Sequence, residues 1–206
     1  MSSPRGWAAP AAGPDAGAAL LERAVGYTRL SLQLAGSADR HACTPCDRWD
    51  LLDLLRHMDD SLAAFTEAAE VGYVDLLPVL GSGPGDGVVG LLLDRLRARA
   101  CALVAAWSDR PARSRVEVGR PDVALDADLL AAAGALEIAV HGWDVAQACG
   151  VDRPLPAGLA LDLLDVAPVL IGDADRPDRF ADVVDVPLHA RPSTRLLAVT
   201  GRVALR

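Results

Sequence analysis

Three polar side chains share one face of the otherwise apolar segment Leu129–Gly150. Glu137, His141 and Asp144 are spaced i, i+4 and i+7, and at about 100° per residue they fall on one stripe of an α-helix, within roughly 40° of each other. Burying an unpaired carboxylate or imidazole is costly, so each group needs a compensating partner. A divalent metal ion is one such partner, and the i, i+4 spacing lets Glu137 and His141 reach the same ion.

A third ligand can come from a second helix-like segment. His57 lies beside a stripe of apolar residues with i, i+3, i+4 spacing, which is typical of a helix that packs in a core. A set of His57, Glu137 and His141 from two facing helices leaves coordination positions open, as catalytic zinc sites do. The alternative is that both histidines lie at the edge of the core and that Glu137 pairs with an arginine. The other two histidines, His41 and His189, fall in expected loops, and we expect both to be exposed to solvent.

The four cysteines are too sparse for a disulfide scaffold. Cys43 and Cys46 form a CxxC motif, which can be a redox pair or half of a zinc site. A structural zinc site needs a second pair of ligands, and Cys101 and Cys149 do not have the spacing of a pair. No strand–CxxC–helix pattern surrounds the motif, so we expect Cys43 and Cys46 to be ordinary residues of a loop that enters a helix.

The elements that position these residues are mostly helices, because apolar spacing is helical along most of the chain. Asp50 is expected to cap the second helix, and Asp126 or Asp128 the fourth. Long helices are expected over Ala18–Leu34, Leu51–Val71, Val88–Trp107 and from Asp126 or Asp128 to Ala148, with a shorter one over Ala157–Leu170. Smaller features are a strand at Arg115–Val118 with a turn at Gly119–Pro121, loops at 81–87 and 172–179, an extended segment at Val183–Pro187 and a final helical turn or two at Thr194–Val199.

This order of elements predicts an all-α fold, an antiparallel four-helix bundle with short additional helices and a small β-hairpin. Residues 1–16 are expected to be a disordered lead-in, and residues 17–206 to form a single metal-binding helical bundle domain. Half of the chain is hydrophobic (51%), which is enough for a sizeable core.

Composition excludes several classes of partner. The formal charge is −8 and no basic cluster occurs, which argues against nucleic acid and anionic membranes. No apolar run reaches the roughly 20 residues of a membrane span, and the N-terminus lacks signal-peptide features. We therefore expect a cytoplasmic protein, a monomer or homodimer. Every basic residue is arginine and asparagine is absent, a codon bias that indicates a GC-rich bacterial genome, that of an actinomycete.

Two motifs together resemble a known family. The run TPCDRWDLLDLLRHM (Thr44–Met58) is followed some eighty residues later by ALEIAVHGWDVAQACG (Ala135–Gly150). The pair is similar to the mycothiol-dependent maleylpyruvate isomerase-like family, a branch of the DinB/YfiT-like metal-binding four-helix bundles. The C-terminal run RPSTRLLAVTGR resembles the ending of single-domain members, so the resemblance extends from about Ala18 to Arg202.

The resemblance implies a metal site at His57, Glu137 and His141, with zinc as the expected ion and mycothiol as the cosubstrate. It also implies that Asp144 is an active-site acid. From its position about one turn beyond His141, Asp144 can act as a general acid or base or orient a metal ligand; the alternative is an exposed or helix-pairing carboxylate. The isomerase also carries a sterol-carrier-like domain that supplies an arginine. No such domain follows in this sequence, and residues 70–125 match no substrate pocket.

The chemistry of such a site follows from its open metal position. A free thiol has a pKa of about 8.5, and metal coordination makes it a thiolate outright. A bound thiolate can add to an electrophile and leave again, which is isomerisation, or stay attached, which is group transfer. We therefore expect a transferase or isomerase that activates a small thiol against a small electrophilic substrate. Two alternatives stay open: a metal-dependent hydrolase, and a non-catalytic metal- or ligand-binding bundle.

Overall fold

The structure is a computed structural model in which residues 16–46, 49–74, 89–110, 114–177 and 179–205 are described. It is mainly helical with one small three-stranded sheet, which confirms the predicted all-α class. The predicted loop at 81–87 and the predicted lead-in lie outside the described residues, except that Ala16 belongs to the first helix.

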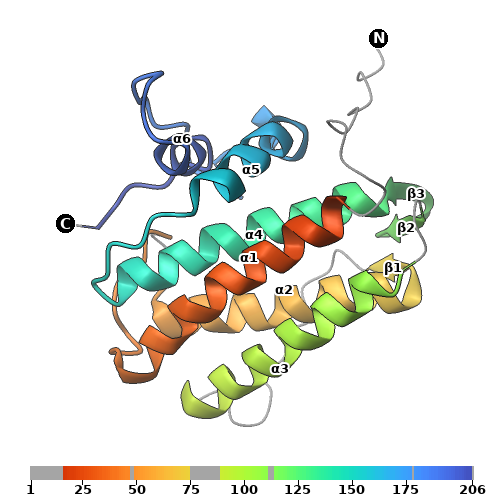
Figure 1. Cartoon of the computed structure of the whole chain (residues 1–206), viewed down its shortest axis with the longest axis horizontal. Helices are drawn as coiled ribbons and strands as arrows, with labels where there is room; N and C mark the ends of the chain where they lie inside the picture. Colours follow the sequence, from red (N-terminus) through yellow and green to blue (C-terminus); the bar gives the residue numbers. More distant parts are fainter. Residues whose placement is uncertain (1–15, 47–48, 75–88, 111–113, 178, 206) are drawn as a thin grey trace.

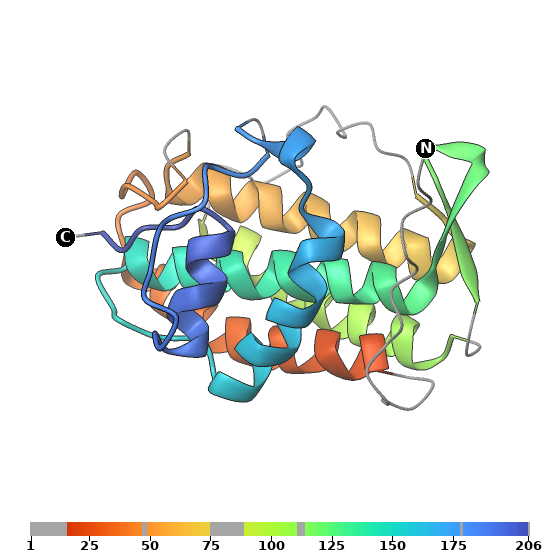
Figure 2. The ribbon, with the colours of Figure 1, turned by 90° about the horizontal axis from the view of Figure 1, so that it is seen from above.

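Four long helices form the bundle, and two shorter helices pack on one side of it (Figures 1 and 2). The bundle helices are α1 (Ala16–Leu34), α2 (Leu51–Val71), α3 (Val89–Ser108) and α4 (Ala127–Ala148). The added helices are α5 (Ala157–Leu170) and α6 (Pro192–Val199), with short 3₁₀ turns at η1 (Ala35–Ser37) and η2 (Asp173–Asp175). The second of these turns lies inside the predicted loop at 172–179.

The bundle helices form two pairs of parallel neighbours. In the pair α2 and α3, Asp59 meets Arg95 at 2.8 Å and the Phe65 carbonyl accepts from Trp107 at 3.1 Å, so both helices run the same way. In the pair α1 and α4, the Thr28 hydroxyl donates to the Ile138 carbonyl at 2.8 Å, deep in the packed surface. Figure 1 shows α1 and α4 running opposite to α2 and α3. The predicted antiparallel arrangement is therefore wrong for two pairs of neighbours, because α1 is parallel to α4 and α2 is parallel to α3.

The ends of the site-bearing helices follow from their capping residues. Asp50 caps α2 by accepting a hydrogen bond from the backbone N–H three residues later, and Gly72 ends that helix in the left-handed region with φ of 77°. Of the two candidate caps for α4, Asp126 is the one that accepts, at 2.9 Å from the Asp128 N–H. Gly150 follows α4 with φ of 71°. These caps fix where the two site-bearing helices begin and end.

The small sheet contains the predicted β-hairpin and one strand that was not predicted. The hairpin consists of β2 (Arg115–Val118), at the residues predicted, and β3 (Arg120–Asp126), which pairs with it antiparallel; β1 (Tyr73–Val74) is the added strand and pairs with β2 parallel. The predicted turn at Gly119–Pro121 is shorter than expected, because β3 already begins at its second residue. β1 has only two residues, too few to show a period. No strand forms at Val183–Pro187, where a strand-like extended segment was expected.

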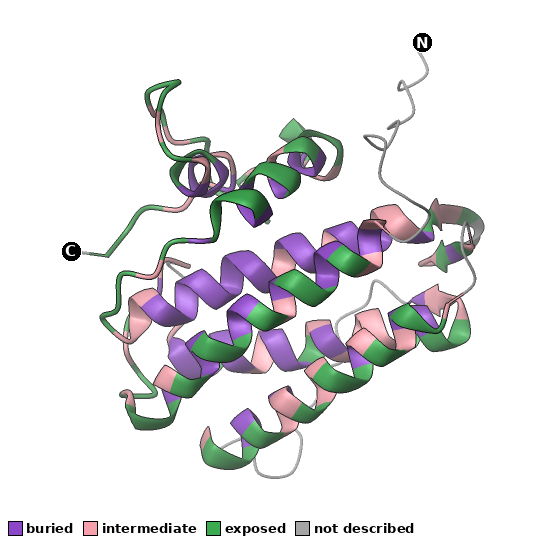
Figure 3. Cartoon of the chain, viewed as in Figure 1, coloured by how far each residue is buried: buried purple, intermediate pink, exposed green. Residues whose placement is uncertain are grey.

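Helix α4 is the centre of the core. It is long and apolar enough to cross a membrane by length and composition alone, but 83% of its apolar window is buried inside the protein. Figure 3 shows it buried along almost its whole length. That burial is what the core helix of a soluble protein shows, and it means that every polar group on α4 must find a partner within the protein.

The close contact of α1 with α4 gives a stability prediction. In Gly142→Ala the new Cβ would lie 2.2 Å from Thr28 Oγ1, so we expect destabilisation of about 1–3 kcal/mol. The matched control is Gly26→Ala on the exposed face of α1, where a Cβ meets nothing within 4 Å and alanine should stabilise the helix by up to about 1 kcal/mol. Urea unfolding measures both changes, and equal midpoints would contradict this packing.

Candidate metal centre

Two helices bring the predicted ligand set together. His57 of α2 places Nε2 2.6 Å from Glu137 Oε1 of α4, and His141 Nε2 lies 3.3 Å from the same oxygen. One ligand atom from each of the three residues lies within 4.8 Å of the other two. Ser61, one turn after His57, donates a hydrogen bond of 3.2 Å to Glu137 Oε1. The residues selected by spacing are therefore assembled as a candidate metal-ligand group.

The donor set suits zinc. Imidazole nitrogens and carboxylate oxygens bind zinc at about 2.0–2.2 Å, which puts tetrahedral neighbours about 3.3 Å apart. The His141–Glu137 separation of 3.3 Å already has this value, whereas the 2.6 Å contact of His57 with Glu137 is a hydrogen bond that would lengthen on binding. The side chains of His57 and Glu137 are 34% and 27% exposed, so an ion can reach the set from outside.

A cavity of about 380 Å³ reaches two of the three ligands, Glu137 and His141. Side chains from all four bundle helices line it, including Val104 of α3. This helix belongs to the region 70–125, in which the sequence showed no pocket motif. Helix α3 forms one wall of the cavity. This wall consists of ordinary core and surface side chains, so no sequence motif reveals it.

Asp144 contacts the other nitrogen of the shared imidazole. His141 Nδ1 lies 2.9 Å from Asp144 Oδ2, and the Asp144 side chain is fully buried. A metal-binding histidine usually donates its second ring nitrogen to such a carboxylate, which fixes the tautomer and the orientation of the ring. Asp144 does not line the cavity. Of the two functional roles considered for it, the geometry favours orientation of His141 over contact with a substrate.

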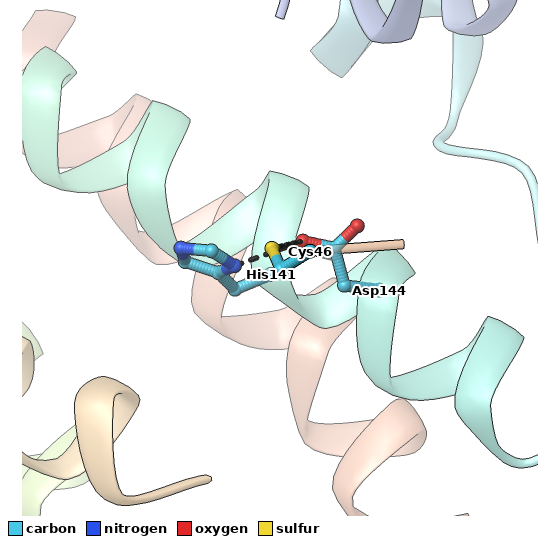
Figure 4. A group of neighbouring side chains, drawn as sticks. All are labelled: Cys46, His141 and Asp144. Atoms are coloured by element: carbon cyan, nitrogen blue, oxygen red, sulfur yellow. Dashed lines mark hydrogen bonds and ion pairs between the residues drawn. The ribbon is translucent and has the colours of Figure 1, made fainter. Parts of the chain in front are cut away.

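Cys46 and Arg202 surround the same carboxylate. Cys46 Sγ donates to Asp144 Oδ2 at 3.3 Å (Figure 4), and Arg202 Nη2 lies 3.3 Å from the sulfur and 3.4 Å from that oxygen. Cys46, His141 and Asp144 form a second group of possible metal ligands. The guanidinium this close to two of its donors opposes a cation there by charge repulsion. The group that contains His57 is therefore the better candidate.

The two cysteines of the CxxC motif have different surroundings. Cys43 is exposed and forms an isolated antiparallel bridge with Asp50, whereas Cys46 is half-buried against Asp144. Both thiols are free. Sequence reasoning treated Cys46 as an ordinary loop residue and did not consider Arg202, because no local pattern reveals contacts across 98 and 58 residues.

Aromatic packing fixes the two imidazole rings. The Trp49 ring centroid lies 4.4 Å from that of His57 and 6.0 Å from that of His141. Trp49 comes just before α2, so the chain that enters this helix also covers the ligand set. The prediction that His41 and His189 are exposed is confirmed, and neither approaches the centre.

Opposite charges and hydrogen bonds within the centre shift the pKa values of Glu137, His141 and Asp144. Burial raises the pKa of Glu137, but the charges of His141 and His57 and their hydrogen bonds outweigh burial and hold that pKa well below its usual value. Burial lowers the pKa of His141, but the charge of Glu137 and the hydrogen bond to Asp144 raise it well above its usual value. Burial raises the pKa of Asp144, but the hydrogen bond from His141 and the charge of Arg202 lower it. The raised pKa favours the protonated imidazole of His141. A metal ion that binds to the metal-free protein must therefore compete with this proton.

Metal content tests the ligand set directly. The purified protein is expected to carry about one zinc ion per chain, and His57→Ala, Glu137→Ala and His141→Ala should each lose most of it, because each removes one of three donors. Elemental analysis of the dialysed proteins measures this. Cys46→Ser is the matched control and should keep the metal. Full retention in all three alanine variants would refute the set, and loss in Cys46→Ser alone would move the metal to the group around Asp144.

Zinc affinity should rise with pH. Binding displaces the proton of His141, whose raised pKa moves the competition to higher pH, so affinity should increase by about tenfold per pH unit until the pH passes that pKa.

The stability of the metal-free protein should change in the opposite direction. Protonated His141 stabilises the fold fully below the ordinary histidine pKa of about 6.5, and this contribution is lost as the pH rises through the raised value.

A chelating dye gives the affinity, and thermal unfolding in EDTA gives the stability of the metal-free protein. Asp144→Asn removes the carboxylate that raises the pKa of His141, so both pH profiles should move to lower pH. At high pH, where protons no longer compete, the variant should bind zinc about 10- to 100-fold more weakly. Profiles identical to those of the wild-type protein would show that Asp144 does not position His141.

Comparison with curated proteins finds two relatives, both from Mycobacterium tuberculosis. Uncharacterized protein MT0763 of strain CDC 1551 / Oshkosh and uncharacterized protein Rv0738 of strain ATCC 25618 / H37Rv are each 27% identical to this chain over 161 residues. The matched region is 77% of this chain and 82% of each relative. No family model and no solved structure matches the chain.

Proposed function

We propose that this chain is a divalent-metal enzyme of the DinB/YfiT-like kind that activates a small thiol against a small electrophilic substrate. The observation that supports this most is the group of His57, Glu137 and His141, two of which line a cavity of about 380 Å³. A group of ionisable side chains that is largely buried and lines a pocket is a typical setting for a functional site. The proposed ion is zinc, and the proposed reaction is group transfer or isomerisation.

The donor set explains why a thiol is the proposed nucleophile. Three protein ligands leave room for a further ligand on a zinc ion. When bound, zinc would supply the Lewis acidity that keeps a small thiol deprotonated near neutral pH. Glu137 and His141 both face the cavity, so an electrophile held there would lie beside the ligand set. Proximity of this kind lowers the entropic part of the barrier for attack by sulfur.

The groups behind the ligands hold them in place. Ser61 donates to Glu137 Oε1, and Asp144 accepts from the imidazole of His141. The hydrogen bond from His141 and the charge of Arg202 both lower the pKa of the Asp144 carboxyl against the effect of burial, and so favour its ionised form. We assign Asp144 a positioning role in the reaction, because it is fully buried and does not line the cavity.

The identity of the thiol is proposed from composition. Arginine supplies all 20 basic residues of the chain, which fits a GC-rich actinomycete genome, and both relatives come from a mycobacterium. The abundant small thiol of such cells is mycothiol, which is kept reduced in the cytoplasm. We therefore propose mycothiol as cosubstrate and the cytoplasm as the place of action, with the chain a monomer or homodimer.

Cobalt substitution tests thiol binding without knowledge of the electrophile. Addition of mycothiol to the cobalt-loaded protein should produce a sulfur-to-cobalt charge-transfer band in the near ultraviolet. S-methyl mycothiol is the matched ligand, and it should give no band because it cannot form a thiolate. Cys46→Ser should behave as the wild-type protein, which excludes the protein's own sulfur as the source of the band.

Two outcomes would contradict the proposed thiol chemistry. A cobalt-loaded protein with no sulfur band at millimolar mycothiol would favour activation of water and hence the hydrolase alternative. Failure to load cobalt or zinc at all would favour a bundle that binds ligands without a metal.

A further inference from the structure

The cavity opens between α1 and α3. Its outer residues follow one face of each helix at i, i+4 and i+7: Glu22, Gly26 and Arg29 on α1, and Arg97, Cys101 and Val104 on α3. All six are exposed or half-buried, and Figure 3 shows exposed residues along the outward side of both helices. This mouth leads inward to the ligand set, because Glu137 and His141 line the same cavity.

The interior of the cavity is apolar apart from the metal ligands and two hydroxyl groups. Met58, Leu62 and Ile138 are 4%, 3% and 4% exposed and line it below the mouth. Thr28 uses its hydroxyl on the Ile138 carbonyl, and the Ser61 hydroxyl is bound to Glu137, so neither donates to a ligand. A polar substrate body would leave its hydroxyl or amide groups unpaired on these walls, at a cost in free energy. The interior suits an apolar body.

The mouth carries positive charge at the end nearest His141. Arg29 directly follows Thr28, which contacts α4 at Ile138, and among the described residues no carboxylate pairs with Arg29. Arg97 on the opposite helix contacts Asp94 at 2.8 Å, with 39% and 74% of the two side chains exposed, and such surface pairs are weak.

The negative charges of the cavity do not cancel this pair. Glu22 lies two helical turns before Arg29, about 10 Å away along the axis of α1. The Glu137 carboxylate is already bound by His57 and His141 in the ligand set. The two guanidinium groups, Arg29 and Arg97, are therefore the groups at the mouth that can receive an anion.

We propose that the cavity binds an organic acid with an apolar body, its carboxylate held by Arg29 and Arg97 and its body against the buried walls. The inference rests on the proposed function for the role of the site and deepens it by naming the substrate class. The cavity volume of about 380 Å³ is within the range of small-molecule sites. Guanidinium–carboxylate pairs have the geometry and charge to orient such a molecule.

Calorimetric titration with octanoate tests the proposal, and octanol is the uncharged counterpart. Both ligands are titrated into the zinc-loaded protein and into the protein from which a chelator has removed the metal. Octanoate should bind in both forms and more tightly than octanol. Arg29→Met and Arg97→Met should each weaken octanoate by about tenfold and leave octanol unchanged. Arg23→Met is the matched control, because Arg23 is on α1 but pairs with Asp162 at 2.6 Å and does not line the cavity.

A second pair of variants tests whether the cavity is the place of binding. Gly26→Leu should narrow the mouth and weaken or abolish binding of octanoate, because Gly26 lines the cavity; nothing lies within 4 Å of a Cβ at this position, so the backbone accepts a side chain there. Gly90→Leu is its control: a Cβ there also meets nothing within 4 Å, and Gly90 is outside the cavity. Unchanged zinc content and unfolding midpoints no lower than that of the wild-type protein in both variants show that the metal set and the fold are intact.

Three results would overturn the proposal: no binding of octanoate at millimolar concentration, equal binding of octanoate and octanol, or binding that disappears when zinc is removed. The last would mean that the metal ion and not the two arginines receives the carboxylate. These results are separate from those for the proposed function, which depends on zinc content and on the cobalt–mycothiol band.

Discussion

The site depends on one imidazole buried in the central helix. His141 uses both ring nitrogens, Nε2 toward Glu137 Oε1 at 3.3 Å and Nδ1 toward Asp144 Oδ2 at 2.9 Å. Because α4 is otherwise apolar and buried, these groups would destabilise the fold unless each had a partner of opposite charge or a hydrogen bond. The partners come from α2 with the loop before it and from the segment after α6, so two distant parts of the chain must converge on α4.

That convergence gives a role to the two helices outside the bundle. Arg202 directly follows the turn that ends α6 and reaches Asp144 with a side chain that is only 9% exposed. Leu159 of α5 and Leu196 of α6 are almost completely buried, so both helices are held firmly against the protein (Figure 2). A guanidinium and a carboxylate that are buried together must stay together, since either one alone would be an unpaired buried charge. The guanidinium that follows α6 thus helps, with the hydrogen bond from His141, to favour the ionised form of the carboxylate that orients His141.

Helical spacing was enough to predict the parts of the site that lie on regular helices. Glu137, His141 and Asp144 share a stripe because of the helical repeat, and His57 was selected because it lies beside an apolar stripe on a second helix. Cys46 and Arg202 lie in segments with no period, where only the folded chain shows which side chains meet. The same limit applies to the sheet, where β1 has two residues, and to the parallel direction of α2 and α3, which the helical period of each segment does not reveal.

The two nitrogens of His141 divide the site into an open and a sealed side. On the open side, Nε2 and Glu137 face a cavity whose mouth carries Arg29 and Arg97. On the sealed side, Asp144 has no exposed surface and is enclosed by Cys46 and Arg202. Reactive chemistry requires access, whereas orientation requires rigidity and exclusion of water. The fold therefore leaves one side of a single ring accessible and places fixed charges on the other, and the ring transmits the orientation from the sealed side to the open one.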